Sequence, residues 1–482
     1  MYSYRRRAGW QSYPSGWFAL RIHTNGSVIY RMNDLFEGTG LKNQMGTTAS
    51  TVSEFDGPYF KKIFVEPTTR CNFKCKFCVR QAPGSGIEIG DLTLETFQAL
   101  VPAMPDLEAM VFAGIGEPLL HPQIDQFVSL AKQHLPINAW VGIQTNGSLL
   151  NQPLAEKLID AGLDRICVSM DTEKPETFQD IRPGGKFDDI TNAFSVLNRA
   201  KKARDNTNLR LGIEFVLVKN NLMDLPGVLA WAVENGADFA LVTQMLPYDV
   251  SSNDDILFSS NMDISRKFYE QWHAEAVKRD IDLQSIISLR WRFDTTQKEQ
   301  ELVNFVSQME DDAYSRFIPF HYEKLVSEDT AVLHEVEQVF SDARQFAEKT
   351  GLELSLPAIF PAFRRKCNFI EEGSAFVSWQ GTVHPCYFLW HKYVCYVGGV
   401  KKNISLKTVG DLSDQNITEI WNNETFTGFR NAVQKYDFSY CTSCRIGPCT
   451  LMESETFEHD CHATEVPCGH CPWCQGLLQC LR

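Results

Sequence analysis

A cluster of three cysteines constrains this chain more than any other feature of its sequence. Cys71, Cys75 and Cys78 stand in the run VEPTTRCNFKCKFCVRQ with the spacing C-x3-C-x2-C. The 482-residue chain has 15 Cys in all, and eleven of them fall between Cys367 and Cys480. A secreted disulfide scaffold is typically short and begins with a signal peptide, whereas this chain is long and its start lacks an apolar segment. The thiols are therefore predicted to be reduced, in a cytoplasmic protein.

The length of the chain predicts several domains, because a single core rarely grows beyond roughly 300 residues. Residues 1–60 are predicted to form a β-hairpin cap and linker, since Thr24-Asn25-Gly26-Ser27 suits a tight turn. Residues 61–250 are predicted as a partial barrel, residues 251–360 as a helical insertion or bridge, and residues 361–482 as a Cys-rich domain. In this last domain we expect metal sites, more than a large apolar core, to hold the fold together.

The fold class follows from short apolar runs that alternate with helical patterns. Strands are expected at residues 63–65, 109–112, 140–143, 165–169, 211–218 and 239–243. Asn151 and Pro153 suit the start of one intervening helix and Gly162 suits its end. Six such units predict an α/β fold, a partial (β/α)6 barrel of the TIM type. Further along, apolar residues recur at three- or four-residue steps from Leu333 to Ala347, which predicts a helix with one packing face.

The three clustered thiols predict an iron–sulfur cluster with one open position. A structural zinc site normally has four ligands, and no fourth Cys or His lies nearby in the sequence. A four-iron cluster held by three thiolates leaves one iron free to bind a substrate or cofactor. With Phe77 before the last Cys, the motif resembles that of the radical S-adenosylmethionine (SAM) superfamily. The resemblance implies a [4Fe-4S] cluster that binds SAM and cleaves it reductively to a 5′-deoxyadenosyl radical.

The same resemblance implies a set of SAM contacts at the ends of successive strands, where sites lie in βα barrels. Besides Phe77, the set comprises Gly114, Gly116, Glu117 and Pro118 of GIGEP, then Thr145 and Asn146, then Ser169 and Asp171. Ile115 replaces a glycine of the family's usual element. Glu214 and Arg182 are further candidates for contacts to SAM or substrate, with surface ion pairs as the alternative. No side chain is assigned a catalytic role, and Cys167 is expected to be a buried apolar residue.

The C-terminal cysteines resemble a SPASM domain, which holds two auxiliary [4Fe-4S] clusters in radical SAM enzymes. The likeness lies in C-x13-G-x4-C, with Gly381 between Cys367 and Cys386, followed by C-x2-C-x4-C. The ligands that the resemblance implies are Cys367, Cys386, Cys441, Cys444, Cys449, Cys461, Cys468, Cys471 and Cys480. Cys395 and Cys474 are extra to the pattern. The alternative is a structural zinc ribbon around Cys468 and Cys471, since C-x2-C alone does not distinguish zinc from iron.

A closer likeness indicates what the enzyme would modify, which we call its client. The runs IFVEPTTRCNFKC, MLPYDVSSNDDILF and VPCGHCPWCQGLLQC resemble the radical SAM maturases associated with tungsten-containing aldehyde oxidoreductases. This implies a client that is a protein, a peptide or an associated cofactor. Two alternatives stay open: an enzyme that cross-links or epimerises ribosomal peptides, and an electron-transfer protein that never cleaves SAM. Tyr387 stands where anaerobic sulfatase maturases have Asp, which disfavours formylglycine formation.

Charge and hydropathy set the remaining expectations about partners. A net charge of -14 disfavours nucleic acid as a partner, because such binding relies on a basic surface. No apolar run approaches the roughly 18 residues that span a membrane, so no membrane association is expected. The family resemblance implies an enzyme that functions under anaerobic conditions and receives electrons from a reductant such as ferredoxin or flavodoxin.

Overall fold

The computed structural model describes residues 60–204, 208–289, 292, 294–444 and 449–481. The chain divides into two compact units, residues 1–57 and residues 58–482, and the description below concerns the second. The β-hairpin predicted within residues 1–60 lies outside the described residues.

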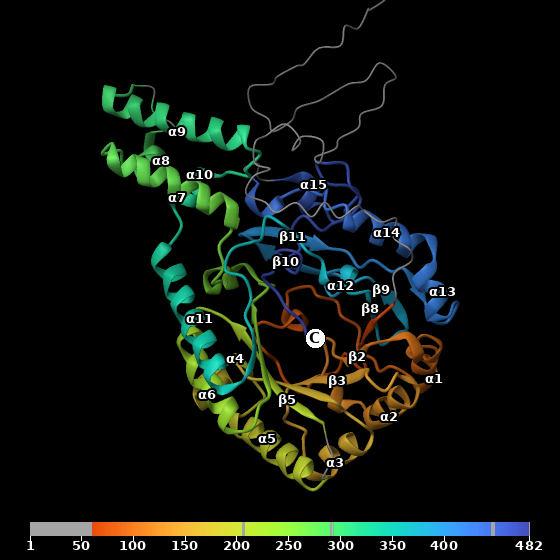
Figure 1. Ribbon diagram of the computed structural model, residues 1–482. Helices are drawn as coiled ribbons and strands as arrows, with labels where there is room; N and C mark the ends of the chain where they lie inside the picture. The colour runs from red at the N-terminus through yellow and green to blue at the C-terminus, as the bar shows by residue number, and fades with distance from the viewer. Residues whose placement is uncertain (1–59, 205–207, 290–291, 293, 445–448, 482) are drawn as a thin grey trace, which may run out of the picture. The chain divides into compact units, whose positions relative to one another are not determined.

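A ten-stranded sheet organises this unit (Figure 1). Its order is β12-β9-β8-β1-β2-β3-β4-β5-β6-β7, and every neighbouring pair from β8 to β7 is parallel. The six predicted strands are β1 (Lys62–Val65), β2 (Ala109–Phe112), β3 (Trp140–Thr145), β4 (Arg165–Ser169), β5 (Arg210–Leu217) and β6 (Phe239–Gln244). They confirm the predicted α/β partial barrel.

Strands from the C-terminal half extend both edges of the predicted barrel. β8 (Ser374–Val377) pairs with β1, and β7 (Glu353–Ser355) pairs with β6. β9 (Thr382–His384) and β12 (Gly410–Asp411) continue beyond β8 in antiparallel pairs. β10 (Tyr393–Val397) and β11 (Val400–Ile404) form a separate antiparallel ribbon. The alternating pattern of residues 62–248 carried no signal for these additions.

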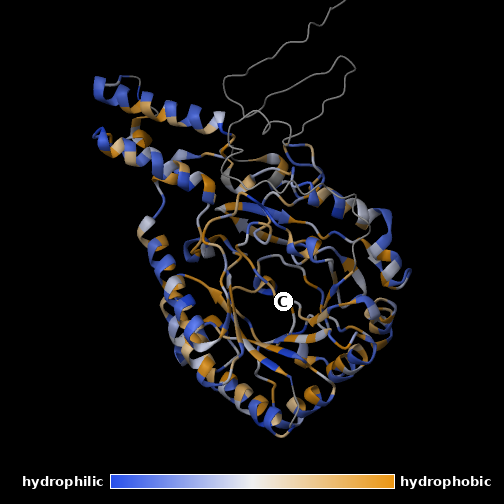
Figure 2. Ribbon diagram, viewed as in Figure 1, coloured by the Kyte–Doolittle hydropathy of each residue, from blue (hydrophilic) through white to orange (hydrophobic). Residues whose placement is uncertain are grey.

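Helices line the outside of the curved sheet, with their apolar faces turned inward (Figures 1 and 2). They include α1 (Leu94–Gln98), α2 (Ile124–His134), α3 (Gln152–Asp160), α4 (Pro175–Ile181), α5 (Phe187–Lys202) and α6 (Leu225–Glu234). The predicted boundaries of α3 are confirmed, because the Asn151 side chain accepts a hydrogen bond from the Leu154 N–H at 3.0 Å. Gly162 follows the helix with φ of +93°, a conformation that favours glycine.

A helical segment follows the barrel strands. α7 (Asp263–Lys278), α8 (Ile286–Leu289), α9 (Gln297–Ser315) and α10 (Tyr322–Val326) share an apolar cluster of their own. α11 (Thr330–Thr350) carries the predicted apolar stripe, which joins the main core beside α6. The prediction of a helix with one packing face is thereby confirmed.

The C-terminal region shares a buried apolar cluster with the inside of the barrel. Phe64, Val111 and Cys167 of the barrel belong to the same cluster as Phe388 and Val433. The region also includes α12 (Asn368–Glu371), α13 (Ile417–Asn422), α14 (Glu424–Gln434) and α15 (Thr450–Glu453). The expectation of little apolar core here was wrong, because aromatic and aliphatic side chains surround the thiols.

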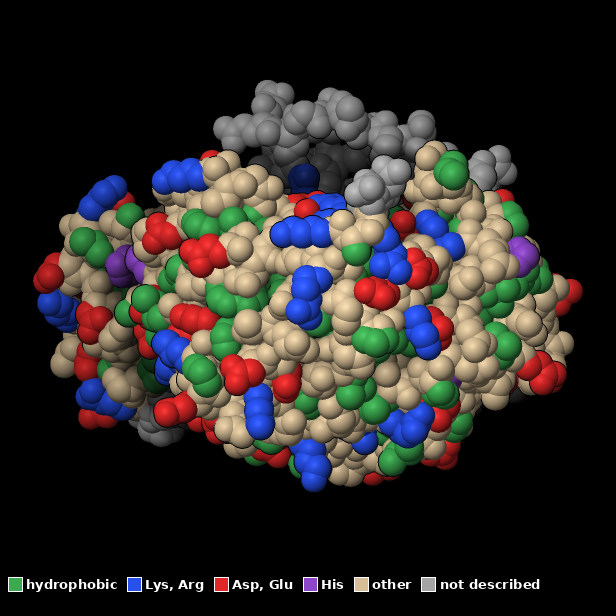
Figure 3. Space-filling view, turned by 90° about the horizontal axis from the view of Figure 1, so that it is seen from below, with side chains coloured by type: hydrophobic (Ala, Val, Ile, Leu, Met, Phe, Trp, Pro, Cys, Tyr) green, Lys and Arg blue, Asp and Glu red, His purple; other side chains and the backbone are tan. Residues whose placement is uncertain are grey.

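The chain ends inside the barrel (Figure 1). The Gln244 N–H at the end of β6 donates to the Leu477 carbonyl at 3.2 Å, and Leu481 is buried beside Gly142 of β3. Within the described residues, no helix is both long and apolar enough to cross a membrane. Figure 3 shows acidic and basic side chains intermixed on the face seen from below.

Candidate functional site

The loop that follows β1 carries the first three thiols, and we call residues 71–78 the cysteine loop. All three thiols are partly buried. Burial raises the pKa of Cys71 and Cys75 and raises that of Cys78 to about 11. The charges of Cys71 and Cys75 raise the pKa of Cys78 further, because like charges close together disfavour ionisation.

Side chains from the end of a strand and the end of a helix contact the cysteine loop. Asn146, after β3, donates from Nδ2 to Asn72 Oδ1 at 2.9 Å and lies 4.0 Å from the Cys71 sulfur. Arg182, after α4, approaches the Cys75 sulfur at 3.8 Å through Nη1. The loop is therefore fixed by residues up to 107 positions away in sequence.

Glu117 joins the ends of β2 and β3. Its carboxylate accepts hydrogen bonds from the Thr145 hydroxyl at 2.6 Å, the Asn146 N–H at 2.6 Å and the Leu119 N–H at 3.0 Å. Burial raises the pKa of Glu117, while these hydrogen bonds lower it. The predicted contacts Glu117, Thr145 and Asn146 thus form one connected network beside the cysteine loop.

Gly114 and Gly116 sit where a side chain does not fit. A Cβ on Gly116 would lie 2.1 Å from the Thr68 carbonyl oxygen, and one on Gly114 would lie 2.6 Å from the Glu66 side chain. The two glycines therefore let the backbone after β2 approach the backbone after β1. Ile115, the departure from the family element, buries its side chain in the cluster shared with the C-terminal region.

Two other predicted residues have mainly apolar or peripheral settings. Pro118 is buried at the start of a short 3-10 helix, Pro118–Leu120. Phe77 is partly exposed within the cysteine loop.

Asp171 and Arg182 form a buried ion pair. Arg182 donates from Nε to Asp171 Oδ2 at 2.6 Å, and the other Asp171 oxygen accepts from the Val216 N–H at 2.9 Å. Ser169 lies nearby and donates to Glu214 at 3.5 Å. The surface alternative was wrong for Arg182, which is 8% exposed, whereas Glu214 is half-buried. The Asp171 carboxylate is occupied by protein donors.

One acidic residue at a strand end escaped the sequence interpretation. Glu66 directly follows β1 and is fully buried. Its carboxylate accepts from the Ile115 N–H at 3.0 Å and pairs with His391 at 3.3 Å. The position of Glu66 after a strand was a usable signal. His391 had no such signal, since it comes from the C-terminal region.

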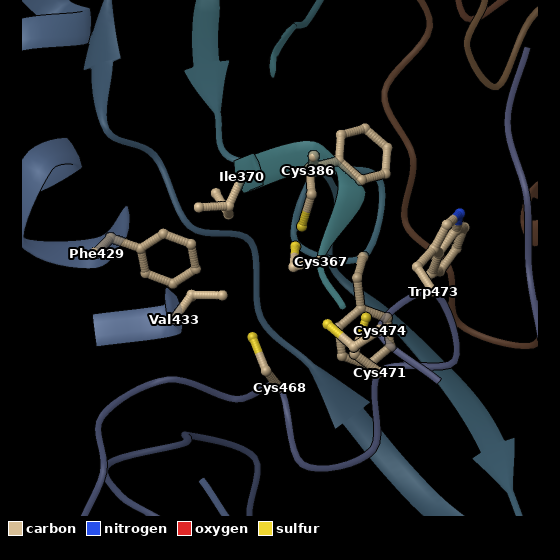
Figure 4. A pocket seen from close by; sticks show the side chains of 11 residues that line it. Cys367, Ile370, Cys386, Phe429, Val433, Cys468, Cys471, Trp473 and Cys474 are labelled. Atoms are coloured by element: carbon tan, nitrogen blue, oxygen red, sulfur yellow. The ribbon is translucent and has the colours of Figure 1, made fainter. Parts of the chain in front are cut away.

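Five C-terminal thiols line one cavity, and we call them the first tail group (Figure 4). The group comprises Cys367, Cys386, Cys468, Cys471 and Cys474. Aromatic and aliphatic side chains complete the lining, among them Phe388, Phe429 and Val433. The structure thus brings four predicted ligands together and adds Cys474, which was taken as extra to the pattern.

Four further thiols form the second tail group: Cys441, Cys444, Cys449 and Cys461. Burial raises the pKa of Cys441 to about 12, and the charges of Cys461 and Cys444 raise it further. The Ser439 hydroxyl lies 3.0 Å from the Cys441 sulfur. All four were predicted ligands, and the charges of Cys444 and Cys449 also act on Cys461, so the four thiols are neighbours.

Arg365 fixes the segment that leads into the second tail group. Its guanidinium donates to the carbonyls of Ser439 at 2.8 Å, Tyr436 at 2.8 Å and Phe438 at 2.7 Å. It also lies over the Tyr440 ring at 3.9 Å. One buried cation therefore orders residues 436–440.

Three cysteines lie apart from these groups. Cys480, a predicted ligand, is not among the residues that line the cavity, and its sulfur accepts from the Trp473 indole N–H at 3.2 Å. Cys395 is buried on β10. Cys167 is buried on β4 as predicted, and burial raises its pKa well above the ordinary value.

The donor sets suit iron–sulfur clusters. Thiolates are the ligands that hold such clusters, and each of the three groups offers three or more. Among the described side chains, no three His, Cys, Asp or Glu residues converge on a single metal ion. The cysteine loop supplies three thiols, the count that leaves one iron of a four-iron cluster open.

Family comparisons agree with this arrangement. The family model of the radical SAM superfamily matches residues 65–217, and that of SPASM, an iron–sulfur cluster-binding domain, matches residues 367–445. The first range contains the cysteine loop and the network around Glu117. The second begins at Cys367 and covers parts of both tail groups.

Individual proteins are similar at lower identity. The tungsten-containing aldehyde ferredoxin oxidoreductase cofactor-modifying protein of Pyrococcus furiosus is 23% identical over 427 residues, which cover 87% of this chain and 97% of that protein. A probable GTP 3′,8-cyclase of Methanocaldococcus jannaschii is 30% identical over 188 residues, 39% of this chain and 59% of the cyclase. The solved structure of Streptococcus suis SuiB bound to S-adenosylmethionine aligns with a TM-score of 0.46 at 13% identity, covering 80% of this chain and 71% of SuiB.

Proposed function

Since this chain is a radical SAM enzyme with a C-terminal SPASM domain, we propose that it modifies an oxidoreductase, or the cofactor of one, during maturation. The observation that carries the proposal is the cysteine loop at the end of β1, contacted by Asn146 after β3 and by Arg182 after α4. Cys71, Cys75 and Cys78 would hold a four-iron cluster there, which would supply the electron for reductive cleavage of SAM to methionine and a 5′-deoxyadenosyl radical able to take a hydrogen atom from the client.

We assign the residues around the cysteine loop separate tasks. Gly114 and Gly116 let the backbone after β2 pack closely against the segment after β1 that leads into the cysteine loop, and Glu117 orients the backbone N–H of Asn146. Asp171 acts on Arg182, since both of its oxygens are already occupied, and Arg182 in turn faces Cys75. Ser169 is the polar group of this set that remains for SAM. Phe77 and Pro118 shape the edges of the site.

We assign one auxiliary [4Fe-4S] cluster to each tail group. The first tail group offers five thiols, so one of them is in excess of four ligands. The second offers four. With the cluster of the cysteine loop, this division gives three clusters and leaves Cys480 outside them. The domain division proposed from the sequence, with boundaries near residues 60, 250 and 360, remains our proposal.

The client assignment rests on the relative from Pyrococcus furiosus, which is named as a cofactor-modifying protein of the tungsten-containing aldehyde ferredoxin oxidoreductase. The similarity extends over 97% of that protein, so it includes the regions outside the two family models. We propose a cytoplasmic, anaerobic setting and a reductant such as ferredoxin or flavodoxin. The net charge of -14 supports a protein client over nucleic acid.

Anaerobic reconstitution with iron and sulfide tests the cluster assignment. We expect about 12 irons per chain for three four-iron clusters, and 5′-deoxyadenosine after addition of SAM and a strong reductant. Cys78→Ala should abolish the product, whereas Cys167→Ala, which alters a buried thiol outside the three groups, should retain it. Bound zinc in place of iron, or 5′-deoxyadenosine from Cys78→Ala, would contradict the assignment.

Product analysis tests the client assignment. Wild type is incubated with SAM, reductant and either a tungsten- or molybdenum-dependent oxidoreductase lacking its mature cofactor, or a short precursor peptide. We expect the oxidoreductase or its cofactor to change in mass and to increase 5′-deoxyadenosine formation. A mass change in the peptide alone would favour the peptide-modifying alternative.

A further inference from the structure

A lysine is buried next to the second tail group. Lys402 lies on β11 and is only 2% exposed. Its Nζ atom has no hydrogen-bond partner among the described residues. An unpaired buried amine is costly, so its place in the interior calls for a compensating group.

The groups that act on Lys402 point to the nature of that compensation. Asn403, next to Lys402 on β11, donates from Nδ2 to the Glu453 carbonyl at 2.8 Å, so β11 lies beside the helix that begins after Cys449. Burial lowers the pKa of Lys402, and the negative charges of Cys441, Cys449, Glu453 and Cys395 oppose this shift. Lys402 in turn lowers the pKa of Cys441. Glu453 accepts a hydrogen bond from the Cys449 N–H at 3.2 Å and forms no ion pair with Lys402 within the described residues. The two thiols are the strongest anionic neighbours of the amine.

Other groups around the second tail group add to its positive surroundings. Lys324, on α10, donates to the Thr442 carbonyl at 3.3 Å, and its pKa is lowered by burial and raised by Cys444. His470 is buried, and burial together with Lys402 and Lys324 lowers its pKa well below the ordinary value. The imidazole is therefore neutral, and the lysines supply the positive charge.

The first tail group has a different lining. Its cavity is bounded by Phe369, Ile370, Phe388, Phe429 and Val433 besides its thiols and Trp473. Arg365 acts on two of its thiols, Cys474 and Cys468, and also on Cys441 of the second tail group. The guanidinium of Arg365 is already engaged by three backbone carbonyls.

We propose that Lys402 is a fixed counter-charge for the auxiliary cluster of the second tail group and raises the reduction potential of that cluster above the value it would otherwise have. This inference rests on the proposed function, which places a cluster there. Reduction adds one electron to a cluster that four thiolates already make anionic, and a nearby ammonium in a low-dielectric interior stabilises the reduced form.

The consequence is an asymmetry between the two auxiliary sites. A cluster with an apolar lining is the harder to reduce, while one beside a buried ammonium is the easier. At equilibrium, the second tail group therefore holds a shared electron in preference to the first. Lys402 would act through its charge on the cluster and would not touch SAM or the client.

A redox titration of the reconstituted full chain, followed by electron paramagnetic resonance, tests the proposal. In Lys402→Met, which removes the charge at similar volume, one auxiliary midpoint should fall while the others stay fixed. We expect at least a tenfold rise in the oxidised-to-reduced ratio at a set potential, which corresponds to about 59 mV for one electron. Lys401→Met, an exposed neighbour on the same strand, should leave every midpoint unchanged.

Lys402→Arg keeps the positive charge and completes the test. It should retain the wild-type midpoint more closely than Lys402→Met does. If Lys402→Met loses the cluster and Lys402→Arg retains it, the result also supports the proposal, because the cluster then requires a positive charge at this position. Unchanged midpoints in Lys402→Met, or equal loss of the cluster in both variants, would overturn the proposal. If wild type itself lacks a cluster that Cys441→Ala removes, the proposed function fails at this site, which is a separate result.

Discussion

The cysteine loop and the tail groups hold their thiols by different means. In the loop, three thiols lie within eight residues, and buried polar side chains from elsewhere in the barrel fix them, as Arg182 does for Cys75. In the first tail group, the thiols come from segments about 100 residues apart and are gathered by apolar packing, whereas those of the second lie within about 20 residues and follow a segment that is fixed by backbone contacts. A site made by local spacing depends on a few polar contacts, whereas a site assembled from distant segments depends on the fold around it.

The largest effect should come from breaking the buried ion pair beside the loop. Asp171→Ala leaves Arg182 as an uncompensated buried cation, so the free energy of unfolding should fall by about 4 kcal/mol. Urea unfolding of the chain before cluster loading measures this change. Iron content after reconstitution should fall by one cluster, that of the cysteine loop.

The double variant Asp171→Ala/Arg182→Met is the control for this ion pair. Removing both partners eliminates the stranded charge, so the double variant should be more stable than Asp171→Ala alone. If the double variant is the less stable of the two, Arg182 is held by other contacts, and the loop does not depend on this pair.

The next largest effect should come from Arg365, which fixes the segment leading into the second tail group. Arg365→Met removes the donor from three backbone carbonyls, which should cost about 3 kcal/mol of unfolding free energy. Because these carbonyls lead into Cys441, the variant should lose the cluster signal of the second tail group and keep that of the cysteine loop. Electron paramagnetic resonance of the reconstituted chain distinguishes the two.

Arg430→Met is the matched control for Arg365. Arg430 is also buried and stacks on Trp421 at 4.0 Å, but it donates to one backbone carbonyl, that of Trp421, and burial alone lowers its pKa. It should lower stability while all three cluster signals remain. Equal loss of signals in the two variants would mean that general destabilisation, not the segment at residues 436–440, removes the cluster.

The sequence predicted the barrel better than its surroundings for a physical reason. Strands β1 to β6 alternate with helices, so their periodicity and turn residues are local signals. The edge strands β7 and β8 have the same hydrogen-bonding partners as barrel strands but belong to segments more than 100 residues further along the chain. Their place in the sheet depends on tertiary pairing, which no local pattern encodes.

The residues of the candidate site also fall into those that local sequence patterns predicted and those that they did not. The C-x3-C-x2-C spacing and the strand-end rule led to Cys71, Glu117 and Asn146, which the structure brings together. Lys402 and His391 come from the C-terminal region, and their neighbours are distant in sequence. A lysine within a β pattern indicates an exposed edge, so its burial could not be predicted.

A smaller effect should appear in the pH dependence of stability. Burial raises the pKa of Glu214 above its ordinary value of 4.5, so the native state keeps a proton that the unfolded chain has released. The free energy of unfolding therefore decreases as pH rises from 4.5 through the raised pKa. Glu214→Gln should flatten this slope in urea unfolding at a series of pH values. A steeper decrease in the variant would contradict the assignment to Glu214.

The smallest effect should come from an ion pair on the surface of the cysteine loop. Lys76 lies between Cys75 and Phe77 and pairs with Asp180 at 2.6 Å, with the two side chains 53% and 68% exposed. Solvent screens such a pair, so Lys76→Ala should change the unfolding free energy by less than about 1 kcal/mol and leave the iron content intact. A loss as large as that of Asp171→Ala would show that exposed contacts hold the loop, and the contrast with the tail groups would then have to rest on sequence spacing alone.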